Sequence, residues 1–370
     1  MTPQELDVWA EVDLGAIKRN VERIVAFVAP SRVLAVVKAD GYGHGGPQVA
    51  RAALEGGASW LGVARVGEGE VLRDAGIADP VLLLAEPPPA LRRRALAAGL
   101  TPALYTAGAA QDYSDASSSG PVAVHVKIDT GMHRYGVAPS QGKEFFQLLE
   151  KLEGIRVEGI WTHLAVAEEA GHPMNADQHQ AFLDVLEQLG SLGHGLIRHV
   201  CNSAAAFNFP EARMDMVRVG ISIYGISPFT DGQSPVTLEP ALCLKSRVSL
   251  VKRLPAGEAL SYGAHYRLAN DAFVATVPCG YADGLPRALG GRGEVLIRGK
   301  RYKISGTITM DHFLVDTGDD EVESGDEVVI IGPQGDDSIS AHEVAANLGT
   351  IPYEVVCGIS ARVPRIFHQS

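Results

Sequence analysis

The stretch VLAVVKADGYGHGGPQVARAALEGGASWLGVAR, residues 33–65, carries the pattern that decides the fold. It begins with the apolar run 33–38, passes through a glycine-rich turn into the helix-like segment 47–56, and ends on a second apolar run, 60–65. A strand, a helix and a second strand in this order predict parallel strands joined by a crossover helix. The same unit recurs along the first two-thirds of the chain.

Eight such runs fall within roughly 200 residues, which is the strand count and spacing of a (β/α)8 barrel. The six later runs are residues 81–86, 101–106, 122–129, 157–163, 197–202 and 216–222. Helices are predicted at residues 15–28, 47–56, 66–75, 91–98, 143–152 and 177–189. A doubly wound open sheet also alternates strand and helix, but it usually stops at about six strands. We therefore expect an α/β fold whose N-terminal part is a TIM barrel.

The sequence changes character near residues 227–240, where prolines and glycines interrupt any long element. Beyond this point the chain is β-rich, with one predicted helix at residues 341–348. The predicted strands are residues 244–253, 273–277, 294–297, 303–309, 313–316 and 327–331. We expect a leading strand within residues 1–14 that pairs with the later domain, a barrel over residues 15–235 and a mainly-β C-terminal domain over residues 236–370.

Composition restricts the classes of function. The 370-residue chain is 46% hydrophobic and carries 32 basic against 44 acidic residues, a net charge of −12. A packed interior can form, and the excess of acid argues against binding to nucleic acid or to a membrane surface. Four cysteines without a CxxC pair fit reduced thiols rather than a disulfide scaffold or a metal site. Because neither a signal peptide nor a membrane-spanning run is visible, we expect a cytoplasmic protein.

In a parallel barrel the active site forms where the strands end, and the first strand ends on Lys38. The following Gly41, Gly43 and Gly46 fit the pattern G-x-G-x-x-G, so a dinucleotide site is one interpretation. Lys38 itself opposes it, as does Arg65, which stands where a ribose-binding acid is expected. A desolvated lysine at a barrel mouth can instead condense with an aldehyde to a Schiff base. Glycines after it let a ligand approach the backbone.

The ends of the later strands add cationic and hydrogen-bonding groups. Arg134 offers a fork for a carboxylate, and Ser203 and Gly220 follow strands seven and eight, where barrels commonly bind phosphate. Singly, each has a plain structural explanation, such as a helix N-cap for Ser203 or a packing glycine. Together they predict a pocket for pyridoxal phosphate. The set comprises Lys38, Lys127, Arg134, His163, Asn202, Ser203, Arg218 and Gly220.

These motifs resemble the alanine racemase family over nearly the whole chain. The most specific is AVVKADGYGHG, residues 35–45, which is similar to the family's cofactor-attachment signature. Further matches are KIDTGMHR at 127–134, SYG at 261–263, GYADG at 280–284, TMD at 309–311 and IPYE at 351–354. The resemblance implies an enzyme that uses pyridoxal phosphate to interconvert L-alanine and D-alanine, the latter for peptidoglycan. It also implies a head-to-tail homodimer with shared active sites.

Carried over position by position, the resemblance also implies roles for single residues. Lys38 would hold the cofactor covalently, and Lys38 and Tyr262 would be the two catalytic bases, with Tyr262 arriving from the partner subunit. Arg218 would face the pyridine nitrogen, and His163 would join a hydrogen-bond network with Arg218 and Tyr262. The phosphate would be held at Tyr42, Asn202, Ser203, Gly220, Ile221 and Tyr353.

The amino-acid substrate has its own set of implied contacts. Its carboxylate would meet Arg134 and the backbone at Met310, with Tyr281 and Asp311 nearby. Lys127 matches a family position often found as a carbamate, which would orient Arg134. No metal is implied.

The sequence departs from the family pattern at a few positions, and other functions stay open. Tyr135 stands where Leu is usual, His312 where Gln is more usual, and Glu168 and Glu169 where Asp or Ser is frequent. One alternative is a racemase for serine, lysine or a broad range of substrates. Another is a non-catalytic barrel that carries pyridoxal phosphate. An amino-acid decarboxylase is a third, although such enzymes usually place an acid, not an arginine, opposite the pyridine nitrogen.

Overall fold

The structure, a computed structural model, describes residues 3–118 and 120–370 and falls into two units. The larger unit comprises residues 17–41 and 45–239. The smaller comprises the described part of residues 1–16 together with residues 42–44 and 240–370. Among the described residues, no helix is long and apolar enough to cross a membrane.

The larger unit is built on eight parallel strands in the order β8-β7-β6-β5-β4-β3-β2-β9. Backbone hydrogen bonds also link the ends of this order, from Asp215 N–H to Arg198 O at 3.1 Å and from Arg218 N–H to Cys201 O at 2.9 Å, so the barrel is nearly closed. The predicted barrel is confirmed. The strands are β2 (Arg32–Val36), β3 (Trp60–Val63), β4 (Val81–Leu83), β5 (Thr101–Leu104), β6 (Val122–Lys127), β7 (Ile155–Trp161), β8 (Ile197–His199) and β9 (Met216–Val219).

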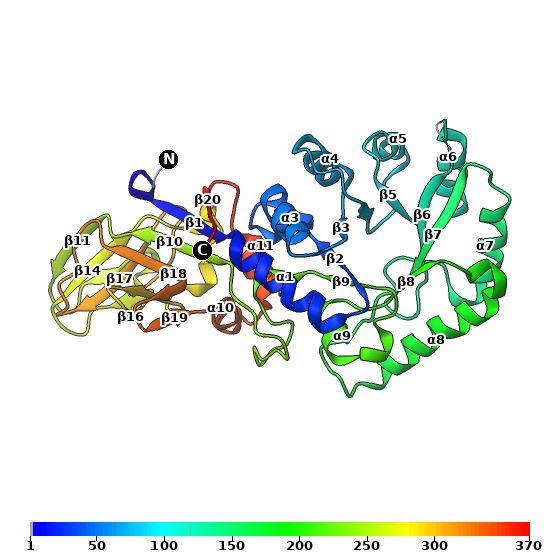
Figure 1. Ribbon diagram of the computed structural model, residues 1–370. Coiled ribbons are helices and arrows are strands. Elements are labelled where there is room, and N and C mark those ends of the chain that lie inside the picture. Colours follow the sequence, from blue (N-terminus) through cyan, green and yellow to red (C-terminus); the bar gives the residue numbers. More distant parts are fainter. Residues whose placement is uncertain (1–2, 119) are drawn as a thin grey trace. The chain divides into compact units, whose positions relative to one another are not determined.

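Helices cover the outer side of these strands, as Figure 1 shows for α4 to α8. Their apolar faces pack on the sheet, while the barrel interior is filled by side chains from the strands. The helices are α1 (Leu14–Val28), α3 (Gly46–Glu55), α4 (Val66–Asp74), α5 (Pro89–Ala97), α6 (Ala107–Ala116), α7 (Gly142–Glu150), α8 (Pro173–Leu189) and α9 (Ser203–Asn208). The prediction missed α6 and α9, because α6 is rich in alanine and α9 has six residues, too few for a helical period.

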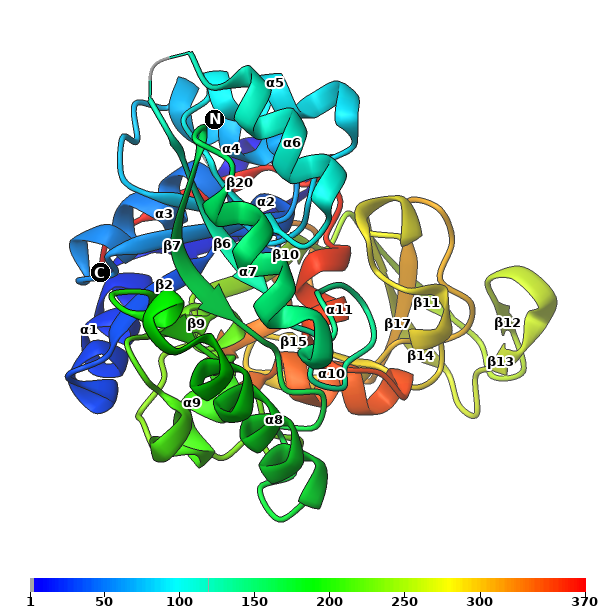
Figure 2. The same cartoon turned by 90° about the vertical axis from the view of Figure 1, so that its right-hand side faces the viewer.

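The smaller unit contains a sheet in the order β16-β15-β18-β10-β1-β20, with β19 paired to β18. The leading strand β1 runs antiparallel to β10 and parallel to β20. Strands β11, β14 and β17 form a second sheet, and Figure 2 shows the β12–β13 hairpin beside it. The strands are β1 (Val8–Asp13), β10 (Leu242–Arg247), β11 (Leu250–Leu254), β12 (Ala259–Leu260), β13 (Tyr266–Arg267), β14 (Ala272–Val277), β15 (Glu294–Ile297), β16 (Lys300–Lys303), β17 (Phe313–Gly318), β18 (Glu327–Gln334), β19 (Asp337–Ile339) and β20 (Arg365–His368).

Two strand predictions for this unit are wrong. The run 244–253 is two strands in different sheets, because Val248 N–H bonds to Asp326 O while Ser249 N–H bonds to Thr276 O. Residues 303–309 are not a strand. The strand there is β16, which follows a tight turn at Arg298 and Gly299 with φ of 51° and 76°. Helix α10 (Ala341–Leu348) has the predicted bounds, whereas α11 (Pro352–Gly358) was missed.

Candidate active site

Lys38 begins a left-handed turn, α2 (Lys38–Tyr42). Ala39, Asp40 and Gly41 have φ of 52°, 52° and 58° and ψ near 50°. A left-handed conformation costs roughly 1–2 kcal/mol for each residue that carries a Cβ. Such a turn therefore persists where the surrounding contacts hold it, and residues held in this way cluster at functional sites.

Glu68 is the main support of this turn. Its carboxylate accepts the Ala39 N–H at 2.8 Å and also the N–H groups of Ala64 at 2.8 Å and Arg65 at 2.9 Å. Sequence reasoning missed Glu68, although it stands three residues after Arg65 at the start of α4, where a glutamate often caps a helix. Asp40 adds a second support, since its carboxylate accepts the Gly46 N–H at 2.7 Å. This turn lies between β2 and α3. The chain therefore does not pass directly from the strand into the helix, as it does in a dinucleotide-binding site.

Arg218, on β9, is a buried cation of the larger unit, with 3% of its surface exposed. Its Nη1 and Nη2 atoms donate to acceptors from β8, from the residue that follows β8 and from the loop after β7. These are His199 O at 2.9 Å, His199 Nδ1 at 3.1 Å, Thr162 O at 2.8 Å, Val200 O at 2.9 Å and His163 Nδ1 at 3.1 Å. Burial lowers the pKa of Arg218 to about 9, which leaves the guanidinium charged at neutral pH.

A guanidinium has five N–H donors and no acceptor. Four of them, on Nη1 and Nη2, are engaged by the groups just named. Within residues 3–118 and 120–370, no acceptor meets the Nε–H of Arg218. A buried arginine with one uncommitted donor fits a ligand that brings a hydrogen-bond acceptor.

His163 is held in one tautomer by the same arginine. Because Arg218 can only donate, His163 Nδ1 must accept, and the ring proton of the neutral imidazole is on Nε2. Burial, together with the cations Arg218, Arg134, Lys127 and Lys38, holds the pKa of His163 well below its usual value. The ring is therefore neutral at physiological pH and keeps an Nε2–H to donate.

The loops after β8 and β9 are joined by a hydrogen bond between two predicted site residues. The Gly220 N–H donates to the hydroxyl of Ser203 at 3.0 Å, and both residues are buried. Asn202, not Ser203, is the N-cap of α9, since its side chain accepts the Ala205 N–H at 2.9 Å. Ile221, fully buried, follows Gly220 directly. The structure thus brings Asn202, Ser203, Gly220 and Ile221 together.

Lys127 ends β6 and is 2% exposed. Its Nζ lies 4.6 Å from the ring centroid of Trp161 and 5.6 Å from that of Tyr135, which in turn stacks on Tyr105. Burial lowers the pKa of Lys127 to about 7, with smaller contributions from Arg134 and other nearby cations. An appreciable fraction of the amine is therefore neutral, and hence nucleophilic, at neutral pH.

Arg134 lies in an exposed loop after β6 that is fixed at its base. Asp129 N–H donates to Val137 O at 2.9 Å, and Val137 N–H donates to Lys127 O at 2.8 Å. Gly136 is required at this base, because a Cβ there would lie 2.6 Å from the Asp129 nitrogen. The base of the loop that carries the Arg134 guanidinium is thus held in place.

In the smaller unit, Tyr42 lies beside Tyr353 of α11, with ring centroids 6.1 Å apart. A Cβ on Gly43 would come within 2.3 Å of Val356 O, so the 42–44 segment needs a glycine to pack against α11. Burial raises the pKa of Tyr42, which keeps its hydroxyl protonated as a donor.

Tyr281, Met310 and Asp311 also come together in the smaller unit. Tyr281 N–H donates to Thr309 O at 3.1 Å, and a Cβ on the preceding Gly280 would lie 2.2 Å from Met310 O. Asp311 pairs with Arg362 at 2.7 Å. Tyr281 and Met310 are 45% and 53% exposed, so this cluster lies open on the described chain.

Tyr262 follows a strained residue and points into solvent. Ser261 has φ of 61° and ψ of −175°, a conformation that is almost confined to glycine. The Ser261 hydroxyl donates to Thr307 O at 2.6 Å, and the Thr307 hydroxyl donates to Tyr262 O at 2.8 Å. The Tyr262 side chain is 73% exposed. A large exposed phenol on a braced, strained loop is unexplained by the packing of its own unit.

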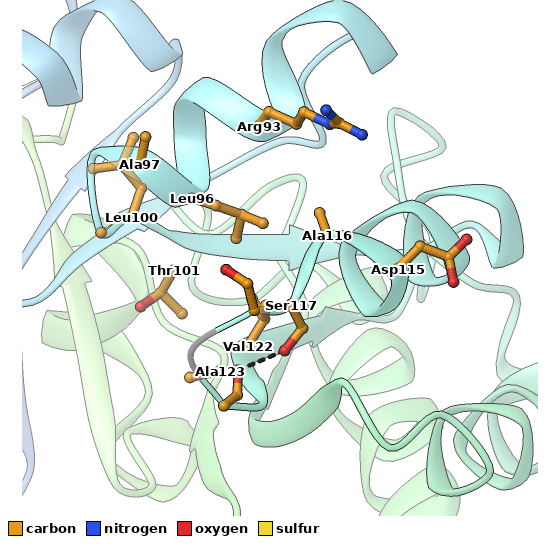
Figure 3. A pocket seen from close by; sticks show the side chains of 13 residues that line it. Arg93, Leu96, Ala97, Leu100, Thr101, Asp115, Ala116, Ser117, Val122 and Ala123 are labelled. Carbon is orange, nitrogen blue, oxygen red and sulfur yellow. Dashed lines mark hydrogen bonds between the residues drawn. The ribbon is translucent and has the colours of Figure 1, made fainter.

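A cavity of about 710 Å³ lies elsewhere, between α5 and α6 at the amino-terminal ends of β5 and β6 (Figure 3). Arg93, Leu96, Thr101 and Val122 are among its lining residues. None of the predicted site residues lines it. In a parallel barrel this end of the strands serves stability rather than chemistry.

The fold and the gathered side chains define the class of protein, a two-domain barrel enzyme with cationic groups at the carboxyl ends of its strands. The profile of the alanine racemase N-terminal domain matches residues 12–228, and that of the C-terminal domain matches residues 241–367. The chain therefore belongs to the alanine racemase family.

Individual relatives agree over almost the full length. The chain is 46% identical to an alanine racemase of Symbiobacterium thermophilum over 97% of this chain and 96% of that protein. It is 41% identical to alanine racemase 2 of Bacillus subtilis, over 98% of this chain and 94% of that protein. A crystal structure of the alanine racemase of Streptomyces lavendulae is similar with a TM-score of 0.94 and 38% identity, over 100% of this chain and 98% of that one.

Proposed function

We propose that this chain is a racemase that interconverts L-alanine and D-alanine with pyridoxal phosphate, using Lys38 and Tyr262 as bases on opposite faces of the substrate. Family membership supports the reaction. The observation that carries the assignment of the cofactor is Arg218, a buried arginine whose Nε–H has no acceptor in the described chain. When bound, pyridoxal phosphate makes the substrate α-proton acidic by delocalising the electron pair left behind.

The residues present fit this cofactor. Lys38 supplies the amine that would hold it covalently, and Arg218 the donor for its pyridine nitrogen. Because an arginine keeps its proton, Arg218 would donate a hydrogen bond to the ring nitrogen without protonating it, which would disfavour transamination. Hydroxyl and backbone groups of Tyr42, Asn202, Ser203, Gly220, Ile221 and Tyr353 would hold the phosphate.

Racemisation removes a proton from one face of the α-carbon and returns one to the other, which two bases achieve directly. The Lys38 amine would serve one face and the Tyr262 hydroxyl the other. To act as a base, the Tyr262 hydroxyl must first give up its own proton, so it needs a hydrogen-bond donor that stabilises the phenolate. The Nε2–H of His163 would be that donor, because His163 Nδ1 accepts from Arg218 and leaves the ring proton on Nε2.

We propose that Tyr262 works in a neighbouring copy of the chain, in a head-to-tail homodimer. Its 73% exposure supports this, because a base must be enclosed with its substrate to be effective. The openness of Tyr281 and Met310 fits the same arrangement. A second copy would thus complete the site from its β-rich unit.

The small amino-acid substrate would be held through its carboxylate. Arg134 and the backbone at Met310 would meet it, with Tyr281 and Asp311 beside them. The neutral fraction of Lys127 supports addition of carbon dioxide to this amine. A bond would form between Nζ and the carbon of carbon dioxide while one amine proton leaves to solvent, and the resulting carbamate anion would orient Arg134. The four free cysteines fit work in the cytoplasm, where D-alanine would be supplied for peptidoglycan.

The direct test is conversion of pure L-alanine into D-alanine by the purified protein with pyridoxal phosphate. The reaction is monitored through the loss of optical rotation. A panel that includes L-serine and L-lysine, compared by kcat/KM, separates the alternatives. Alanine should give the highest value. Preference for serine or lysine would replace the substrate assignment, and binding of the cofactor without racemisation would indicate a non-catalytic carrier.

A further inference from the structure

A line of four polar side chains runs through the barrel interior from Arg218. Arg218 Nη1 lies 3.1 Å from His199 Nδ1, and His199 Nε2 lies 2.8 Å from His125 Nδ1. His125 Nε2 lies 3.7 Å from a carboxylate oxygen of Glu158. The four residues come from β9, β8, β6 and β7. Only Arg218 belongs to the proposed active site.

The chemistry of arginine gives this line a direction. Arg218 can only donate, so His199 Nδ1 must accept and the His199 proton is on Nε2. That proton is donated to His125 Nδ1, so the His125 proton is in turn on Nε2, facing the Glu158 carboxylate. Each ring thus has one allowed neutral tautomer.

The surrounding packing keeps both rings neutral and in place. His199 stacks on Trp161 with an interplanar angle of 7°, and His125 lies 5.1 Å from the Trp60 ring. A Cβ on Gly159 would lie 2.5 Å from His125 Nδ1, so a glycine is required to make room for the ring. Burial lowers the pKa of His125 and holds that of His199 well below its usual value.

We propose that His125 is a positioning residue for Arg218: it accepts the His199 Nε2–H and thereby keeps His199 Nδ1 free to accept from the arginine. With the proton on Nδ1 instead, His199 would face Arg218 donor to donor. Glu158 supports the arrangement, because its negative charge favours the Nε2–H tautomer of His125. The consequence for the cofactor rests on the proposed function, whereas the tautomers themselves do not.

Histidine side-chain ¹⁵N NMR of the full-length protein tests the tautomers directly. In the wild type at neutral pH, His125 and His199 should both give the signals of neutral, Nε2-protonated imidazole. Signals of Nδ1-protonated or doubly protonated rings at either position would overturn the proposal. Because the wild-type spectrum decides this point, the test does not depend on the folding of a variant.

Two substitutions distinguish the effect of losing the hydrogen bond from the effect of changing the packing at His125. His125→Leu removes the acceptor, and we expect the His199 ¹⁵N signals to shift and kcat to fall about tenfold with KM nearly unchanged, as when an orienting partner is lost. His125→Asn keeps an acceptor at the position of Nδ1 and should restore most of both properties. Val124→Ala, in the buried core of the same strand, is the control and should leave the His199 signals unchanged.

The outcomes separate this proposal from the function on which part of it rests. Unchanged His199 signals in His125→Leu, or equal losses of kcat in the Leu and Asn variants, would overturn the positioning role. A wild-type protein with the expected tautomers but no racemisation would contradict the proposed function alone.

Discussion

Lys38 is the side chain on which the proposed chemistry depends most. Lys38→Ala should abolish covalent attachment of pyridoxal phosphate and lower racemisation by about a thousandfold or more, since both the anchor and one base are lost. Borohydride reduction followed by peptide mapping measures the attachment. Lys143→Ala, an exposed lysine on α7, is the control and should behave as the wild type. A cofactor label fixed to another lysine of the unsubstituted protein would contradict the assignment.

Tyr262 offers a second test at the scale of one residue. Tyr262→Phe should impair the two directions of α-hydrogen exchange unequally, because one face of the substrate loses its base while the other keeps Lys38. The free energy of unfolding should stay within about 0.5 kcal/mol, as for other exposed sites. Exchange measured in deuterated water from each enantiomer gives the result. Small, equal effects in both directions, similar to those of Tyr302→Phe, would remove Tyr262 from the mechanism.

The residues that sequence reasoning missed have a common cause. The rule that function gathers at strand ends singles out Arg218 and His163, which prove to contact each other. It says nothing of Glu68, His125 or His199, whose importance comes from partners on other elements. Alternation places His125 and Lys127 on one face of β6. The register between β6, β7 and β8, which a single sequence does not reveal, then decides what they meet.

At the scale of elements, the left-handed turn after Lys38 makes a clear prediction. Ala39→Gly should leave the free energy of unfolding unchanged or raise it by up to about 1 kcal/mol, because a left-handed φ costs glycine little. Ala346→Gly, at an exposed position inside right-handed α10, should lower it by about 1 kcal/mol. Urea unfolding of both variants checks this. A similar decrease in the free energy of unfolding in the Ala39→Gly and Ala346→Gly variants would show that the turn at Ala39 is not left-handed in solution.

Most elements could be predicted, and the errors have physical reasons. The apolar runs of the barrel predict all eight of its strands, but each strand ends two or three residues earlier than its run, because the last residues belong to the loops. Periodicity fails where an apolar run changes sheet, as between β10 and β11. It also fails for α9, which is too short for a helical period.

At the scale of the whole molecule, buried neutral histidines should make stability depend on pH. The pKa values of His125, His163 and His199 are all lowered in the folded chain. Below about pH 6.5 the unfolded chain takes up protons at these positions and the folded chain does not, so stability falls as pH falls. Each ring contributes up to about 1.4 kcal/mol per pH unit between its pKa in the unfolded chain and its lowered pKa in the folded chain.

Denaturant unfolding between neutral pH and about pH 5 measures this slope. The free energy of unfolding should begin to fall as the pH drops below the pKa of histidine in the unfolded chain. It should continue to fall until the pH reaches the lowered pKa values of the folded chain. A free energy of unfolding that is flat over this range would mean that the three rings are protonated in the folded chain.

The central claim is that one active site takes Lys38 from one chain and Tyr262 from another. Complementation tests it most directly: Lys38→Ala and Tyr262→Phe chains are mixed in equal amounts under conditions that allow subunits to exchange. In a dimer with shared sites, half of the dimers are then mixed and each holds one intact site, so the mixture should regain about a quarter of wild-type racemisation. Activity equal to the mean of the two separate variants would contradict the claim.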